Sequence, residues 1–275
     1  MNKTFLSLSL ATLLLAGCSS NQTTTSSTNS DDQFIVGMEC AYAPFNYQVA
    51  SASETSVEIA GGYCDGYDVM IASRIADSLG QELVIKKISW NGLIPALQND
   101  EIDAIIAGMT ADEKREEGVD FTAPYYDSEG MIMIVRADSE EATFTDIQQF
   151  SGKNIVGQMS TNYDTVIDQI EGVNHVAPKQ TYPEMVLALQ SGDVDGITAE
   201  IAVAEGVVAS NPGLTIVEFA EGHGFECDTT VSIGLKEGSR DSEFYNAVSE
   251  ALAGISSEER SQLMLQAVTN QPVEE

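Results

Sequence analysis

Single strands alternate with single helices along this chain, and that alternation limits the folds it can adopt. A short apolar strand is predicted over residues 34–37, and apolar residues at helical spacing predict a helix over 69–79 that stops at Gly80. The same reading continues with strand 82–88, helix 93–98 and strand 102–107. Strands joined by one helix form right-handed βαβ units, so the sequence predicts an α/β protein whose sheets are mostly parallel and flanked by helices.

The pattern then recurs with a displacement of 92 residues. Ala96-Leu97-Gln98 is matched by Ala188-Leu189-Gln190, and Ile102-Asp103 by Val194-Asp195. Helix–turn–strand units of α/β proteins also resemble one another by chance, but two α/β lobes explain the repeat better. Further strands are expected at 131–135 and 231–235, followed by terminal helices within 244–268. If that last part returns to the first lobe, two strands cross between the lobes and can act as a hinge.

The first 17 residues are typical of a secretory signal peptide. Lys3 precedes the largely apolar run Phe5–Leu15, which is shorter than the roughly 20 residues needed to span a bilayer. The run ends in Leu15-Ala16-Gly17-Cys18, which resembles a bacterial lipobox and predicts lipidation of Cys18; an ordinary signal peptide with an incidental cysteine is the alternative. Residues 18–33 are mostly Ser, Thr, Asn and Gln, which predicts a flexible tether between the lipid and a folded body.

The charge of the chain and its few histidines and cysteines restrict the ligands it can bind and the disulfides it can form. With 43 acidic against 12 basic residues the chain has a formal charge of −31, which excludes binding to nucleic-acid phosphates and disfavours anionic lipid surfaces. Only two histidines are present, and no metal-ligand spacing occurs, so neither a metal nor a cofactor is expected. Cys40, Cys64 and Cys227 permit three different single disulfides, and the sequence does not choose among them.

The stretch Ala107–Arg115 carries the clearest chemical signal. It leaves a buried strand through small residues and a hydroxyl, so backbone N–H groups, Thr110 and the Arg115 guanidinium can together receive a carboxylate. Taken alone, Arg115 also fits a surface ion pair with the neighbouring Glu113 or Glu116.

Aromatic and acidic residues form two further groups of candidates. Tyr42 and Tyr67 lie near the first strand and the following helix, where a ring can cover a ligand or stack on a cation; each also fits a core position. Glu39 follows the first strand, and Glu200 follows the matching strand of the second half. A carboxylate there, facing Arg115, would match the ammonium and carboxylate of one amino acid.

Sequence signatures of common enzymes are missing. The chain has no G-x-S-x-G, P-loop, G-x-G-x-x-G or H-E-x-x-H motif, and neither His175 nor His223 stands beside a candidate nucleophile. The sequence therefore predicts a binding protein that is not an enzyme.

An ordered set of motifs resembles the amino-acid-binding family of solute-binding lipoproteins of ABC importers over nearly all of residues 34–267. These motifs are Glu39–Phe45, Gly66–Val69, Trp90–Leu97, Asp103–Thr110 with Lys114-Arg115, Asp120–Tyr126 and Val194–Glu200. The resemblance implies a two-lobed type II periplasmic-binding-protein fold with a two-strand hinge. Lobe 1 would comprise residues 34–127 and 229–275, and lobe 2 residues 128–228.

Carried over by position, the resemblance also implies a ligand site. Its members would be the ring pair Tyr42 and Tyr67, the carboxylate clamp of Arg115, Thr110 and the backbone at Ala107–Gly108, the second-lobe turn Ser160-Thr161, the ammonium partner Glu200, and Glu39 near the ligand's side chain. The family's ammonium partner is usually an aspartate, so the longer Glu200 is a departure, as is serine for the usual glycine at position 160.

By the same resemblance, the protein is a monomer outside the cytoplasm, held to the membrane only through its lipid. It would capture a free polar amino acid, either cationic like lysine or arginine or neutral like glutamine, and deliver it to a permease driven by a cytoplasmic ATPase. A sensory ligand-binding module and a dehydratase-like secreted enzyme on the same scaffold are the alternatives.

Overall fold

The computed structural model describes residues 32–128 and 130–272. The predicted signal peptide, Cys18 and nearly all of the predicted tether lie outside these residues. Within the described part, no helix is both long and apolar enough to cross a membrane.

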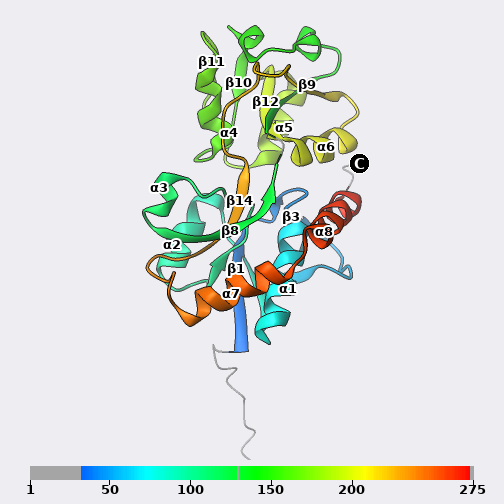
Figure 1. Cartoon of the computed structure of the whole chain (residues 1–275). Helices are drawn as coiled ribbons and strands as arrows, with labels where there is room; N and C mark the ends of the chain where they lie inside the picture. The colour runs from blue at the N-terminus through cyan, green and yellow to red at the C-terminus, as the bar shows by residue number, and fades with distance from the viewer. Residues whose placement is uncertain (1–31, 129, 273–275) are drawn as a thin grey trace, which may run out of the picture.

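The first lobe is built on a five-stranded sheet in the order β6-β1-β7-β14-β8 (Figure 1). In that order the strands are Glu82–Lys87, Gln33–Met38, Ala104–Ile105, Thr230–Lys236 and Val119–Asp127. Around this sheet lie α1 (Tyr67–Leu79), η2 (Trp90–Gly92), α2 (Leu93–Gln98), α3 (Glu113–Glu116), α7 (Glu243–Gly254) and α8 (Ser257–Asn270). As predicted, α1 ends at Gly80, whose left-handed φ of 69° lets its N–H bond to the last turn of the helix.

The second lobe repeats this arrangement with a five-stranded sheet in the order β11-β10-β12-β9-β13. In that order the strands are Asn174–His175, Asn154–Val156, Gly196–Glu200, Met131–Arg136 and Leu214–Val217. Around it lie η3 (Glu140–Thr143), η4 (Ile147–Phe150), α4 (Asn162–Thr165), η5 (Val166–Gln169), α5 (Tyr182–Ser191) and α6 (Ile201–Ser210). Strands β7 and β12, which carry the sequence repeat, occupy the same third place in their sheets, each parallel to the second strand.

Both five-stranded sheets are mixed, so the expectation of mostly parallel sheets was too strong. In the first, β1 is parallel to β6 and β7, whereas β14 is antiparallel to β7 and β8. In the second, β9 is antiparallel to both β12 and β13. Strands β9 and β14 each begin just after the chain has passed from one sheet to the other, so no helical crossover of a βαβ unit dictates their direction.

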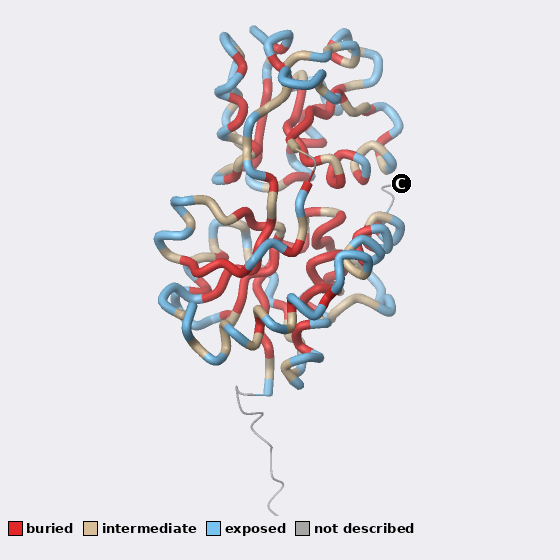
Figure 2. The backbone as a smooth tube through the Cα atoms, in the orientation of Figure 1, coloured by how far each residue is buried: buried red, intermediate tan, exposed pale blue. Residues whose placement is uncertain are grey.

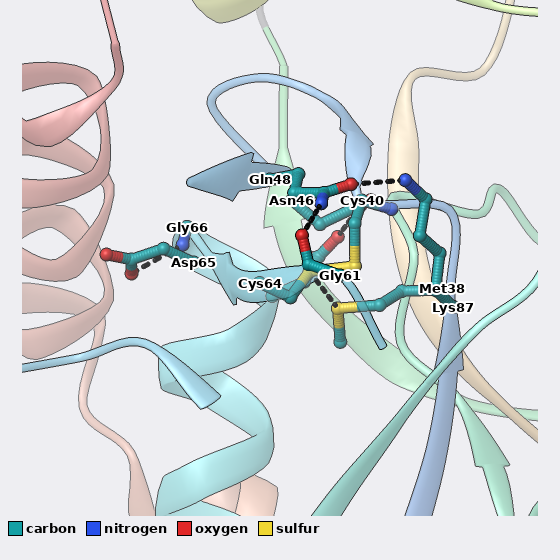
Figure 3. Close-up of a disulfide and its surroundings, with 10 residues drawn as sticks. Met38, Cys40, Asn46, Gln48, Gly61, Cys64, Asp65, Gly66 and Lys87 are labelled. Atoms are coloured by element: carbon teal, nitrogen blue, oxygen red, sulfur yellow. Dashed lines mark hydrogen bonds between the residues drawn. A yellow bond between two sulfur atoms is a disulfide. The ribbon is translucent and has the colours of Figure 1, made fainter. Parts of the chain in front are cut away.

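A small antiparallel sheet, not predicted from the sequence, lies beside the first lobe in the order β2-β3-β5-β4. Its strands are Ala41–Tyr42, Asn46–Val49, Gly62–Asp65 and Val57–Ile59. Here a disulfide joins Cys40 to Cys64, and the Asn46 side chain accepts the Cys40 N–H at 2.7 Å (Figure 3). Cys227 is a free, half-buried thiol, and burial raises its pKa to about 11.

The chain crosses between the sheets twice, from β8 to β9 and from β13 back to β14. Buried segments run through the interior of both lobes, and exposed segments lie on the outside (Figure 2). One apolar cluster fills the first lobe and continues onto one face of the second sheet, while a smaller cluster with Met133 and Val135 covers the other face. Alternating residues of β9 therefore serve two cores, as the pleat of a strand requires.

Candidate functional site

A narrow cavity lies between the lobes, where strands of both sheets end. From the first lobe, Glu39 follows β1, and Ala107, Gly108 and Thr110 follow β7; from the second, Glu200 is the last residue of β12. The full lining is Glu39, Tyr42, Trp90, Ala107, Gly108, Thr110, Arg115, Gln158, Thr161, Asn162, Tyr163 and Glu200. The crevice at the carboxyl ends of the strands is the usual ligand position in open α/β sheets.

Arg115 is held in place by three contacts that leave part of its guanidinium available. Nη1 donates to the Thr110 carbonyl at 2.8 Å, Nη2 to the Ser160 carbonyl at 3.0 Å, and Nε lies 3.2 Å from the Asp112 carboxylate. Since a guanidinium has five N–H donors, one hydrogen on each Nη remains. Burial lowers the Arg115 pKa, yet the group stays charged at any physiological pH.

The turn after β7 brings backbone close to the cavity and requires glycine. Gly108 has a φ of 63°, and a Cβ there would lie 2.8 Å from the Tyr42 ring. Its N–H already donates to the Tyr125 hydroxyl at 3.0 Å, so this amide is occupied. The Thr110 hydroxyl, by contrast, has no hydrogen bond to any residue the structure describes, and it is a free donor beside Arg115.

Glu200 lies on the opposite lobe and is almost completely buried, with 4% of its surface exposed. The Tyr163 hydroxyl hydrogen-bonds its carboxylate, but Oε2 has no partner among the described residues. Burial, reinforced by the negative charges of Asp68 and Asp228, raises the Glu200 pKa to about 8. An unpaired buried carboxylate of this kind is costly, so the site suits an incoming cation.

Glu39 is the second acid of the cavity and is already partly satisfied. Its Oε2 accepts Gln158 Nε2 at 3.2 Å across the lobes, and the backbone N–H of Trp90 also donates to the Glu39 carboxylate. Burial raises the Glu39 pKa, while these two hydrogen bonds oppose the rise.

Contacts between the lobes surround the cavity and hold it closed. The Ser160 carbonyl accepts Trp90 Nε1 at 3.1 Å as well as Arg115 Nη2. Ser160 adopts a left-handed φ of 62°, which is the conformation that the family's usual glycine takes without strain. The hydroxyls of Tyr42 and Tyr163 also meet across the gap. Within the first lobe, the Arg115 guanidinium lies 5.3 Å from the centre of the Trp90 ring.

Most residues named from the sequence meet at this cavity, but two do not line it. Tyr67 begins α1, whose first turn is buried; its hydroxyl donates to the Tyr125 carbonyl at 2.9 Å. Ser160 lines an adjoining groove and takes part through its backbone carbonyl. The predicted residues that do line the cavity are Glu39, Tyr42, Ala107, Gly108, Thr110, Arg115, Thr161 and Glu200.

Sequence reasoning missed Gln158, Asn162 and Tyr163, and it named Trp90 only as the start of the motif Trp90–Leu97. The three missed residues flank Ser160-Thr161 in the segment after β10. Extending the strand-end argument to every residue of that turn would have found them. Among the described residues no cluster of three or more His, Cys, Asp or Glu side chains is arranged to hold a metal ion.

Comparisons with known proteins agree with this architecture. The chain is 30% identical over 205 residues, 74% of each chain, to a probable histidine-binding protein of Campylobacter jejuni. The arginine-bound form of truncated ArgBP from T. maritima is 29% identical with a TM-score of 0.69, covering 82% of this chain and 98% of that one. An ancestral arginine-binding protein bound to glutamine is 26% identical with a TM-score of 0.72, covering 86% and 97%.

The match to a family model spans both lobes and both crossings between them. It extends over residues 34–267 and is to the bacterial extracellular solute-binding proteins, family 3. It thus includes the strand ends and loops that supply the cavity lining from Glu39 to Glu200. This chain belongs to family 3 of the bacterial extracellular solute-binding proteins.

Proposed function

We propose that this protein captures a free amino acid in the cavity between its lobes and delivers it to the permease of an ABC importer. The observation that carries this proposal is the pairing of Arg115, with two free N–H donors, and Glu200, with an unpaired oxygen, in one closed space. The two groups come from opposite lobes. An amino acid offers a carboxylate and an ammonium on the same carbon, which is the complement of this pair.

The carboxylate end of the ligand would be received by the first lobe. The free hydrogens on the two Nη atoms of Arg115 form a fork that matches the two oxygens of a carboxylate. The Thr110 hydroxyl stands beside them as a third donor, and Thr161 reaches the same cavity from the second lobe.

The ammonium end would pair with Glu200. The surroundings of Glu200 supply hydrogen-bond acceptors and ring faces. Arg115, on the opposite lobe, is the sole Lys or Arg side chain in the described lining, so no other protein cation competes with the ligand's ammonium for Glu200. Glutamate takes the place of the family's usual aspartate here, and its extra methylene lets the carboxylate reach a ligand held slightly further from β12.

The second acid, Glu39, favours a ligand with a cationic side chain. Once a zwitterion has neutralised Arg115 and Glu200, Glu39 is left as a buried carboxylate with only neutral hydrogen-bond partners. A lysine- or arginine-like ammonium or guanidinium would compensate it, with Tyr42 and Trp90 as flanking rings. Two of the related structures contain arginine and glutamine respectively, so a neutral polar ligand is the competing class.

Ligand contacts from both lobes would shift an open–closed equilibrium toward the closed state. The crossings at residues 127–131 and 217–230 would act as the hinge between lobe 1 (34–127 and 229–275) and lobe 2 (128–228). Members of the family are extracellular solute-binding proteins, and we infer that this chain works outside the cytoplasm by binding rather than by catalysis. We further propose that it is a monomer anchored through lipid on Cys18.

A thermal-shift screen of the twenty standard L-amino acids with ornithine and cystine tests this function. A ligand at a thousand times its Kd stabilises the folded state by about 4 kcal/mol, which is readily seen as a rise in Tm. We expect L-arginine or L-lysine to give the largest rise and acidic amino acids none. If millimolar concentrations of every amino acid leave Tm unchanged, the proposal fails.

A further inference from the structure

The closed cavity contains a carboxylate that the protein itself does not neutralise. Glu200 is 4% exposed, Oε2 is without a partner in the described residues, and the titratable groups that interact with it electrostatically are carboxylates, tyrosines and a thiol. They are Asp68 at the start of α1, Asp228 before β14, the thiol Cys227 and the tyrosines Tyr42, Tyr163 and Tyr182. The one cation of the lining, Arg115, is already shared with Asp112.

The burial of Glu200 depends on the lobes being closed. Glu200 belongs to the second lobe, whereas Tyr42, Gly108 and Thr110, which line the cavity with it, belong to the first. Separating the lobes removes these groups and lets water reach the carboxylate. Closing them without a ligand strips that water away and supplies no cation in return, which is unfavourable for any ionised carboxylate.

We propose that Glu200 keeps the empty receptor open, and that the ammonium of the amino acid removes this obstacle, so that the closed form is reserved for the loaded protein. The second half of this statement rests on the proposed function; the first half concerns the ligand-free protein alone. The closing contacts that need no ligand, such as those to the Ser160 carbonyl, would otherwise favour empty closure. A receptor that closed empty would compete with loaded receptors for the permease.

A proton can take the place of the ligand's ammonium, which gives the proposal a pH signature. Burial raises the Glu200 pKa to about 8 in the closed form, and opening removes the part of this burial that the first lobe supplies, so the closed empty form holds a proton more tightly than the open form. Lowering the pH from about 8 toward the lower pKa of the open form therefore favours empty closure, by up to tenfold in the closed-to-open ratio for each pH unit. Glu39 is shifted in the same direction, so the Glu200 contribution is the difference between wild type and a Glu200 variant.

The experiment measures closure of the ligand-free full chain between pH 8 and pH 5. Small-angle scattering reports the smaller radius of gyration of the closed form. Trp90, the only tryptophan, reports the lobe interface by fluorescence because its indole bonds to the Ser160 carbonyl. Three proteins are compared: wild type, Glu200→Gln, and the control Glu205→Gln, which removes an exposed acid from α6 of the same lobe.

We expect wild type and the control to be open at pH 8 and to close progressively as the pH falls. Glu200→Gln should be at least tenfold more closed than wild type at pH 7.5 and should lose most of the pH dependence. Equal closed fractions for all three proteins at pH 7.5 overturn the proposal. If Glu200→Gln does not fold, the wild-type series decides, because a closed fraction that does not rise from pH 7.5 to pH 5.5 also overturns it.

Failure of this inference is distinguishable from failure of the proposed function. The scattering series uses no amino acid, so it can succeed although every amino acid fails to bind. Conversely, wild type could bind an amino acid tightly while its empty form closes independently of Glu200. That result would support the proposed function and refute the role of Glu200 in keeping the empty receptor open.

Discussion

Replacement of Arg115 is the most informative perturbation of the proposed carboxylate clamp. Each charge-assisted hydrogen bond contributes about 1.5–3 kcal/mol, and the two free Nη hydrogens would make two such bonds to the ligand. Arg115→Ala should therefore weaken binding by about 3–6 kcal/mol, or about 10²–10⁴-fold in Kd. Arg115→Lys keeps the charge but loses the fork, so a loss of about 10–100-fold is expected.

Titration calorimetry with L-arginine, or with the amino acid that gives the largest thermal shift, measures both losses. Arg74→Ala is the matched control, because Arg74 forms an exposed ion pair with Glu259 on the outer side of the first lobe. It should leave Kd unchanged, since such surface pairs contribute little. If Arg115→Ala is folded and binds within threefold of wild type, the guanidinium does not hold the carboxylate and the clamp is wrong.

Three other perturbations test separate parts of the account. Glu39→Gln should raise the Kd for L-arginine about tenfold and leave that for L-glutamine nearly unchanged in calorimetry; equal effects would remove the reason to prefer a cationic ligand. Cys18→Ala should move the protein from the membrane to the soluble fraction of the cell envelope, and unchanged fractionation would contradict the lipid anchor. Replacing Cys40 and Cys64 together by alanine should cost about 3 kcal/mol of unfolding free energy in a denaturant titration; an unchanged midpoint would show that the bridge does not stabilise the fold.

The alternation of strands and helices was enough to predict the main architecture. The predicted strands at 34–37 and 102–107 and the helix at 69–79 correspond to β1, β7 and α1, because their hydrophobic periodicity is local. The small sheet β2–β5 was missed, since its strands are two to four residues long and rich in Asn, Gly, Cys and Tyr. The direction of the strands in the mixed sheets could not be predicted from local sequence patterns either, because it depends on how the chain returns from the other lobe.

The residues of the site also fall into some that the sequence could place and others that it could not. Residues at the end of a strand, such as Glu200, or directly after one, such as Glu39, could be placed at the crevice because the carboxyl ends of parallel strands share one edge. Tyr67 was assigned by position to the ring pair, but the burial of the first turn of α1 places it under Phe45 and Tyr125 instead. Tyr163 lies in the segment after β10 and could have been included by the same argument, but its meeting with Tyr42 depends on how the two lobes come together, which no local property of a sequence encodes.

The spacing of the cysteines left the disulfide pairing open, and the tertiary structure determines which two cysteines pair. Three pairings were possible, and the structure joins Cys40 to Cys64, with Met38 Sδ 3.6 Å from the Cys64 sulfur (Figure 3). The pairing follows from β3 lying between β2 and β5 in the small sheet, which brings the end of β1 next to β5. Because that sheet was not predicted, its cysteine pair could not be predicted either.

A crystal structure of the protein with its tightest-binding amino acid would show directly whether the ligand joins Arg115 to Glu200. We expect one amino acid in the cavity between the lobes, with its carboxylate within hydrogen-bonding distance of the Arg115 Nη atoms and the Thr110 hydroxyl, and its ammonium on Glu200. An amino acid bound elsewhere, or an Arg115 guanidinium turned toward solvent while the ligand is bound, would contradict it.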